Sequence, residues 1–96
     1  MLFEWDDAKE RINKMKHGID FDTASSVFSD PLRIEIFDNK HSTLSEERYM
    51  TIGKINGATY ILSVVYTERN ESIRLISARH ANAAERKAYY DNSKIY

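Results

Sequence analysis

Residues 48–80, RYMTIGKINGATYILSVVYTERNESIRLISARH, decide the fold, because they hold three strand patterns joined by two tight turns. The pair "NG" at 56–57 is the strongest short hairpin signal and predicts a type I′ turn. A second tight turn is expected around Arg69-Asn70. We therefore expect strands over 48–55, 58–67 and 72–80, the second of them apolar on both faces and central in the sheet.

Two helices are predicted upstream of these strands. The first begins at an Asp6 N-cap and ends at Gly18, with cationic residues in its last turn. Its predicted buried stripe consists of Ala8, Ile12 and Met15. The second helix covers about 20–28, with Asp20 as N-cap, and "SDP" (29–31) ends it.

The remaining patterns complete an α+β fold. Alternation from Leu32 to Ile36 predicts a strand, and a polar loop at 38–47 follows it. Asn82 and Glu85 resemble a capping box for a helix through about Asp91. We expect one domain, 1–96, with a four-stranded antiparallel sheet, two N-terminal helices and one C-terminal helix. The stretch "LFEW" (2–5) leaves open a short extra N-terminal strand.

Turn positions also predict which side chains share a sheet face. Pairing Tyr49 with Val64, and Val64 with Leu75, places most of the isoleucines on the other face, which we expect to be the better core. Arg74 and Arg79 have opposite parity, so a regular strand separates them. A β-bulge would bring them together.

The amino-acid composition restricts which functions are possible for this chain. The chain has 96 residues, 42% hydrophobic and 30% charged, with a mean hydropathy of −0.59. It lacks cysteine, which excludes disulfides and thiolate chemistry and suits a cytoplasmic protein. No segment is apolar enough to predict a membrane span. His17, His41 and His80 are too scattered for a metal site, so we expect no metal and no cofactor. A net charge of −1 requires that any nucleic-acid surface be locally basic.

Several motifs in order resemble the BrnT toxins of type II toxin–antitoxin systems. They are "FEWDDAKERINKMKHGIDF", "VFSDP", "EERYMTIGKINGATYILSVVYTERNESIRLISARHA" and "ERKAYY". The resemblance implies a small RelE-like ribonuclease that is inhibited by a ribbon-helix-helix antitoxin, BrnA, and reaches operator DNA only through that antitoxin. It also implies catalytic roles for Glu68, Arg74, Arg79 and the position of His80.

These residue types fit RNA cleavage without a metal, in which the 2′-hydroxyl attacks the adjacent phosphate. Arginine binds phosphate with a planar fork and stays charged. Glu68 is a candidate base and His80 a candidate acid. Tyr66 or Tyr49 would stack an unpaired base. We assign RNA binding to Lys16, His17, Tyr66 and Arg69.

Other interpretations stay open. Arg74 and Arg79 fit surface ion pairs with Glu47, Glu68 or Glu71, His17 fits a helix C-terminus, and His41 fits an exposed loop. Two functions compete with the ribonuclease: a non-catalytic toxin-like subunit of a DNA-binding repressor complex, and an inactive toxin.

Overall fold

The computed structural model describes residues 1–55 and 59–93. The predicted "NG" turn and the pairing of Ile55 with Ala58 lie outside the described residues. In chain order the elements are β1 (Leu2–Glu4), α1 (Asp7–His17), α2 (Phe21–Ser25), the 3₁₀ helix η1 (Ser26–Ser29), β2 (Ile34–Phe37), β3 (Arg48–Lys54), β4 (Ile61–Arg69), β5 (Ser72–His80) and α3 (Ala83–Ser93). The predicted second helix is therefore shorter and ends in a 3₁₀ turn. No helix in these described ranges is long and apolar enough to cross a membrane.

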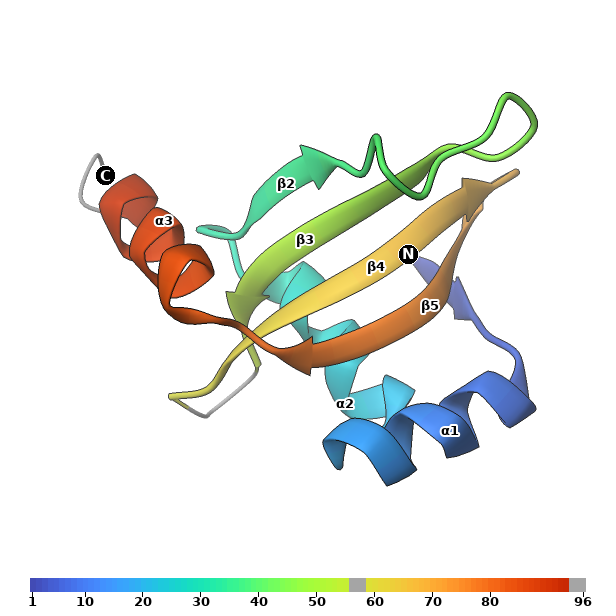
Figure 1. The fold of residues 1–96 in the computed structure, drawn as a ribbon, viewed down its shortest axis with the longest axis horizontal. Helices are drawn as coiled ribbons and strands as arrows, with labels where there is room; N and C mark the ends of the chain where they lie inside the picture. Colours follow the sequence, from blue (N-terminus) through green and yellow to red (C-terminus); the bar gives the residue numbers. More distant parts are fainter. Residues whose placement is uncertain (56–58, 94–96) are drawn as a thin grey trace.

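One mixed sheet runs through the molecule, with strand order β1-β5-β4-β3-β2 (Figure 1). The prediction of an α+β fold is confirmed, but the prediction of four antiparallel strands is incomplete. Residues 2–4 form a fifth strand, and β1 pairs with β5 in parallel. A parallel pair needs a long crossover connection, and here most of the chain lies between the two strands.

The register differs from the predicted one and contains the β-bulge that the sequence left open. Tyr49 lies opposite Tyr66 rather than Val64. Tyr66 lies opposite Leu75, whereas Val65 lies opposite Ser77, which leaves one extra residue in β5. The extra residue reverses the side-chain parity of β5 from Ser77 onward. Ala78 and His80 therefore share a face with Val64, and Arg79 turns to the opposite face.

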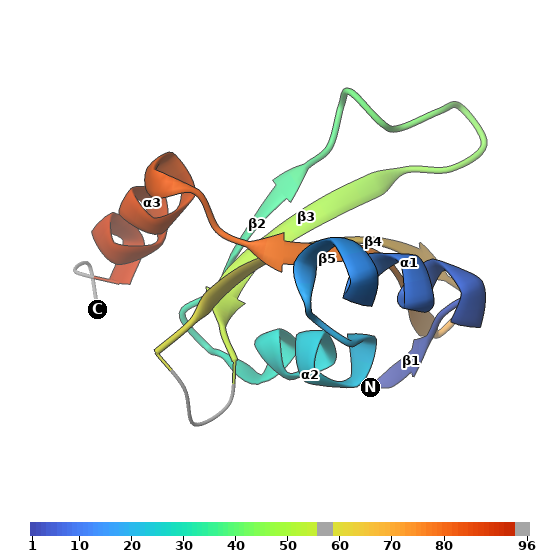
Figure 2. The same cartoon turned by 60° about the horizontal axis from the view of Figure 1, so that its bottom comes forward.

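The main core lies on the sheet face that we call the inner face, the one packed against α1, α2 and η1. Figure 2 shows α1 and α2 together on this side, with α3 apart at one end. Our expectation that the isoleucine-bearing face holds the better core is wrong. The inner-face core consists of Ile19, Phe21, Ala24, Val27, Phe28, Leu62, Val64, Tyr66, Leu75 and Ala78.

The opposite face, which we call the outer face, has a smaller cluster at one end. Ile52 and Ile61 pack there against Ala81 and Tyr89, the latter on α3. The rest of the outer face retains partly exposed strand residues such as Met50 and Val65. α3 thus closes one end of this face and leaves the middle of the sheet accessible.

α1 attaches to the sheet through a polar residue rather than through its apolar stripe. Ile12 and Met15 are 55% and 87% exposed, so the predicted buried stripe is wrong. The buried residue is Asn13, whose Nδ2 donates to the carbonyls of Ala78 and Ile19 at 2.9 and 3.0 Å. Its Oδ1 accepts from the Ala78 N–H at 3.0 Å. Asn13 therefore pairs with β5 as a neighbouring strand would, beyond the point where β1 ends.

The capping residues predicted from the sequence cap the helices in the structure. The Asp6 carboxylate accepts from the Ala8 and Lys9 N–H groups, and Gly18 ends α1 with a φ of 70°. Asp20 caps α2, and Asn82 and Glu85 exchange the two hydrogen bonds of a capping box. These predictions are confirmed.

Candidate functional site on the outer sheet face

The bulge places Arg74 and Arg79 on the same face of the sheet. Arg74 lies opposite Thr67 in β4, and Arg79 lies opposite Ser63. Because a strand rises about 3.3 Å per residue, the two positions are roughly 13 Å apart along β4. Arg48 lies in the same row as Thr67 and Arg74. The outer face thus carries arginines at both ends of its accessible part.

Each of these arginines also has a carboxylate partner within the chain. Arg74 Nη1 lies 3.2 Å from Glu4, and Arg79 makes a bidentate pair with Glu85 at 2.7 and 2.8 Å. Both arginines therefore form ion pairs, as one interpretation of the sequence expected. Their partners are Glu4 and Glu85 rather than Glu47, Glu68 or Glu71.

The Arg79–Glu85 pair joins β5 to the first turn of α3. Hydrogen bonds from Arg79, aided by the Asn82 N–H and opposed by burial, lower the pKa of Glu85 to about 2. The hydroxyl of Ser63, the residue opposite Arg79, is buried and has no hydrogen-bond partner among the described residues. The same pair raises the pKa of Arg79. Arg79 therefore stays charged and is held in one orientation.

One edge of the Arg79 fork remains available. Nη1 and Nη2 donate to Glu85, and Nη1 also donates to the His80 carbonyl at 3.3 Å. Among the described residues, no acceptor faces Nε–H or the second N–H of Nη2, which lie side by side. A phosphate can dock on this edge without displacing Glu85, because a guanidinium carries five donors.

A hollow of about 320 Å³ lies on the outer face beside Arg79. Its floor is one row across the sheet, formed by Ile36, Met50, Val65 and Ser77. Phe37, 46% exposed, lies at the rim. The hollow combines an apolar floor with a cation at one side, which suits a nucleotide with its base or ribose against carbon and its phosphate against arginine.

A histidine and an aspartate from the β2–β3 loop complete the rim. His41 Nδ1 lies 2.9 Å from Asp38 Oδ2, and both residues line the hollow with Arg79. The sequence indicated only an exposed loop histidine for His41. The sequence signal for this pair is the spacing of three residues between Asp38 and His41. That spacing is too common in proteins to identify a site by itself.

Lys16 and His17 lie near the same region from the side of α1. Both are exposed, and with Ile76 and Ser77 they border a shallow hollow of about 170 Å³. Ser77 lines this hollow and the larger one. The two predicted RNA-binding residues thus lie next to the outer face, around the edge of β5.

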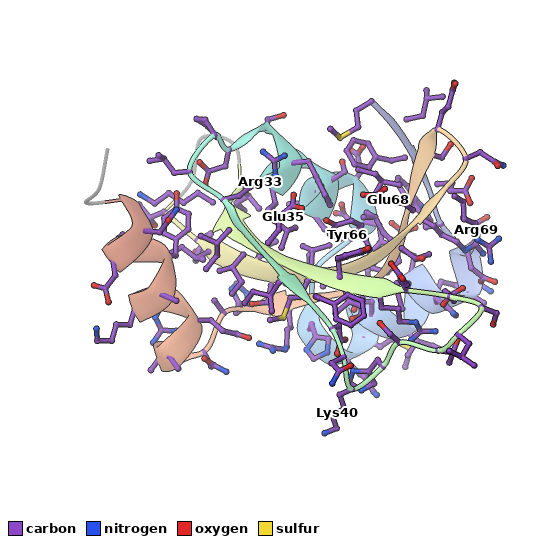
Figure 3. The ribbon with its side chains drawn as sticks, turned by 90° about the horizontal axis from the view of Figure 1, so that it is seen from above. Arg33, Glu35, Lys40, Tyr66, Glu68 and Arg69 are labelled. Carbon is purple, nitrogen blue, oxygen red and sulfur yellow. The ribbon has the colours of Figure 1, made fainter. Side chains whose placement is uncertain are left out.

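Tyr66 belongs to the inner face and is only 2% exposed, so it cannot stack a base in this conformation. Its hydroxyl donates to Glu35 at 2.8 Å, and Arg33 Nε donates to the same carboxylate at 3.1 Å (Figure 3). Burial, then the bond to Glu35, raise the pKa of Tyr66. Tyr49 stacks on Tyr66 with ring centroids 5.7 Å apart. Tyr66 is a core residue.

Glu68 and Arg69, labelled in Figure 3, are the last two residues of β4, and neither lines the outer-face hollow. They line a hollow of about 330 Å³ together with Ser45, Glu46, Glu47, Tyr49 and Thr67. Three carboxylates lie here with one arginine, and Arg69 is already 3.7 Å from Glu46. Such a charge balance disfavours a phosphate.

His80 is the remaining predicted catalytic residue, and it lies on the opposite face from Arg79. It faces Leu62 in β4, and its ring meets Tyr60 edge-on at 5.6 Å between centroids. The structure therefore brings Arg74 and Arg79 to one face and leaves Glu68 and His80 on the other. In the described ranges, no group of three or more histidine or acidic residues is arranged to hold a metal ion.

The fold and the site define a small α+β protein whose open sheet face presents arginines beside a nucleotide-sized hollow. A family model described as "Ribonuclease toxin, BrnT, of type II toxin-antitoxin system" matches residues 5–85. The chain belongs to this family of ribonuclease toxins, which act on RNA and are paired with an antitoxin. The curated proteins searched include no match to it.

Proposed function

We propose that this toxin is a metal-independent endoribonuclease that binds RNA across its outer sheet face. The 2′-oxygen attacks the neighbouring phosphorus, the bond to the 5′-oxygen breaks, and a 2′,3′-cyclic phosphate end forms. Arg79 contacts the scissile phosphate through its available edge, and Arg74 contacts a neighbouring phosphate. Preorganised cations of this kind are often the largest contribution to catalysis.

The observation that carries the proposal is the β-bulge in β5, which turns Arg79 to the face of Arg74. Glu85 supports it, because a bidentate partner holds the guanidinium in place before RNA binds. Lys16 and His17 extend the cationic path around the edge of β5, and Met50 and Val65 offer an apolar floor for a base or ribose. Catalytic roles for Glu68 and His80 stay predictions from the sequence and form no part of this proposal, because both residues lie on the inner face.

We further propose a RelE-like fold, a BrnA-like ribbon-helix-helix antitoxin that covers the outer face, and contact with operator DNA only through that antitoxin. A covered site would explain inhibition, because an acidic or aromatic antitoxin segment complements the arginines. The cytoplasm, where RNA and the antitoxin are both present, is the proposed location.

One observation favours the alternative of a non-catalytic subunit, namely that Arg74 and Arg79 are already ion-paired. Incubation of the purified toxin with RNA in EDTA separates the two functions. The proposal predicts cleavage with 2′,3′-cyclic phosphate ends, which the saturating antitoxin abolishes. Cleavage that strictly requires Mg²⁺, or full cleavage by the saturated complex, would contradict it.

A further inference from the structure

We infer that His41 is the general base of the cleavage reaction and that Asp38 orients it. The inference rests on the proposed function. It arises from a side-chain pair that the family match does not assign, at the rim of the hollow that also contains Arg79.

The geometry of the pair leaves one ring nitrogen available for chemistry. Asp38 Oδ2 lies 2.9 Å from His41 Nδ1, and a carboxylate accepts hydrogen bonds only, so Nδ1 carries the proton. Nε2 of the neutral ring then has a free lone pair. Among the described residues, no hydrogen-bond partner faces Nε2. This arrangement fixes the tautomer that a base needs.

The loop holds Asp38 firmly while leaving His41 accessible. The Asp38 N–H donates to the Arg48 carbonyl at 2.8 Å, and its carbonyl accepts from the Ser42 hydroxyl at 2.6 Å. The side chain of Asp38 is only 14% exposed, whereas that of His41 is 57% exposed. A mostly buried carboxylate behind an exposed imidazole is an arrangement that stabilises a transient imidazolium.

The position of His41 relative to Arg79 gives the two residues complementary roles. The charged and titratable groups that line the hollow with His41 are Asp38 and Arg79. An RNA phosphate on the open edge of Arg79 would place the attached ribose over the floor of Met50 and Val65, facing the β2–β3 loop. Phosphate stabilisation and proton removal would then come from opposite sides of one hollow.

The proton transfers of this step balance with His41 and water alone. His41 Nε2 takes the proton of the 2′-hydroxyl as the 2′-oxygen bonds to phosphorus and the bond to the 5′-oxygen breaks. Water protonates the departing 5′-oxygen, and the resulting hydroxide takes the proton from His41. The products are a 2′,3′-cyclic phosphate and a 5′-hydroxyl, and His41 returns to its neutral form.

The test compares single-turnover cleavage of RNA in EDTA by the wild type, His41→Gln, His41→Ala and Asp38→Asn. A general base contributes about 10²–10⁴-fold, so His41→Gln should lose cleavage on that scale and should lose the base limb of the pH–rate profile. Added imidazole should partly restore His41→Ala. Asp38→Asn should lose less, with an altered pH profile. Binding of 2′-O-methyl RNA and the melting temperature of His41→Gln should match the wild type.

Lys40→Ala is the matched control, because Lys40 lies in the same loop and extends away from the body of the molecule (Figure 3). It should cleave at the wild-type rate. Wild-type cleavage rates for His41→Gln would overturn the role of His41 while leaving the proposed function intact. A loss in His41→Ala that imidazole does not restore, with weaker binding of 2′-O-methyl RNA, would overturn it in favour of a binding role. A wild-type protein that does not cut RNA in EDTA would overturn the proposed function, and this inference with it.

Discussion

At the residue scale, the bond between Arg79 and Glu85 changes how Arg79 must be tested. An isolated surface cation contributes under about 1 kcal/mol to stability. Arg79 is 41% exposed, but its partner Glu85 is only 12% exposed, so Arg79→Ala leaves a largely buried carboxylate unpaired. We therefore expect Arg79→Ala to lower the melting temperature measurably, and Arg79→Lys becomes the safer probe of catalysis.

The pair also predicts a pH dependence of stability. Glu85 has a pKa of about 2 in the folded chain against an ordinary 4.5, so it stabilises the fold above pH 4.5 and loses this effect as the pH falls toward 2. The shift corresponds to roughly 2 kcal/mol once solvent screening at Arg79 is allowed for. Glu85→Gln, which keeps the capping box, should be less stable than the wild type at pH 7.

Urea unfolding of the wild type and of Glu85→Gln at a series of pH values measures the contribution of the ion pair to stability. The gap between their free energies of unfolding should shrink between pH 4.5 and 2. Parallel curves over that whole range would show that the ion pair contributes nothing to stability.

At the element scale, the attachment of α1 to β5 depends on Asn13. Asn13→Ala would leave the buried N–H and C=O of Ala78 without their partner, which should cost roughly 2–3 kcal/mol. Ile12→Ala, at an exposed neighbouring position, is the control and should be nearly silent. Chemical denaturation gives both values. Equal stability of the two variants would mean that α1 is held by other contacts.

These elements also show what a single sequence can and cannot predict. The strands and caps were predictable, because their signals are local: alternation, turn residues, and Asp or Asn at a helix start. The buried face of α1 was not predictable. Periodicity identifies the apolar side of a helix, but it does not tell whether that side contacts the sheet. Asn13 looks like any polar helix residue until Ala78 is placed beside it. The candidate site depends on the bulge in the same way, since one extra residue in β5 decides which face holds Arg79.

At the scale of the whole molecule, the two faces of the sheet have different roles in this account. The inner face is a core, and Tyr66 is part of it. Tyr66→Phe removes the hydrogen bond to Glu35 and should cost about 1 kcal/mol of stability, while RNA cleavage should stay near the wild-type rate. Melting and cleavage measured on the same preparation check this. Abolished cleavage in a well-folded Tyr66→Phe protein would move the active site to the inner face.

Cleavage rates in EDTA for Arg79→Lys and Glu68→Gln, measured beside the wild type, show whether RNA is cut on the outer face. Lysine keeps the charge but not the fork, so Arg79→Lys should lose up to roughly 3 kcal/mol of transition-state stabilisation, about a hundredfold in rate, while remaining folded. Glu68→Gln, on the opposite face, should cleave like the wild type. The reverse result, with Arg79→Lys fully active and Glu68→Gln inactive, would place the active site on the inner face.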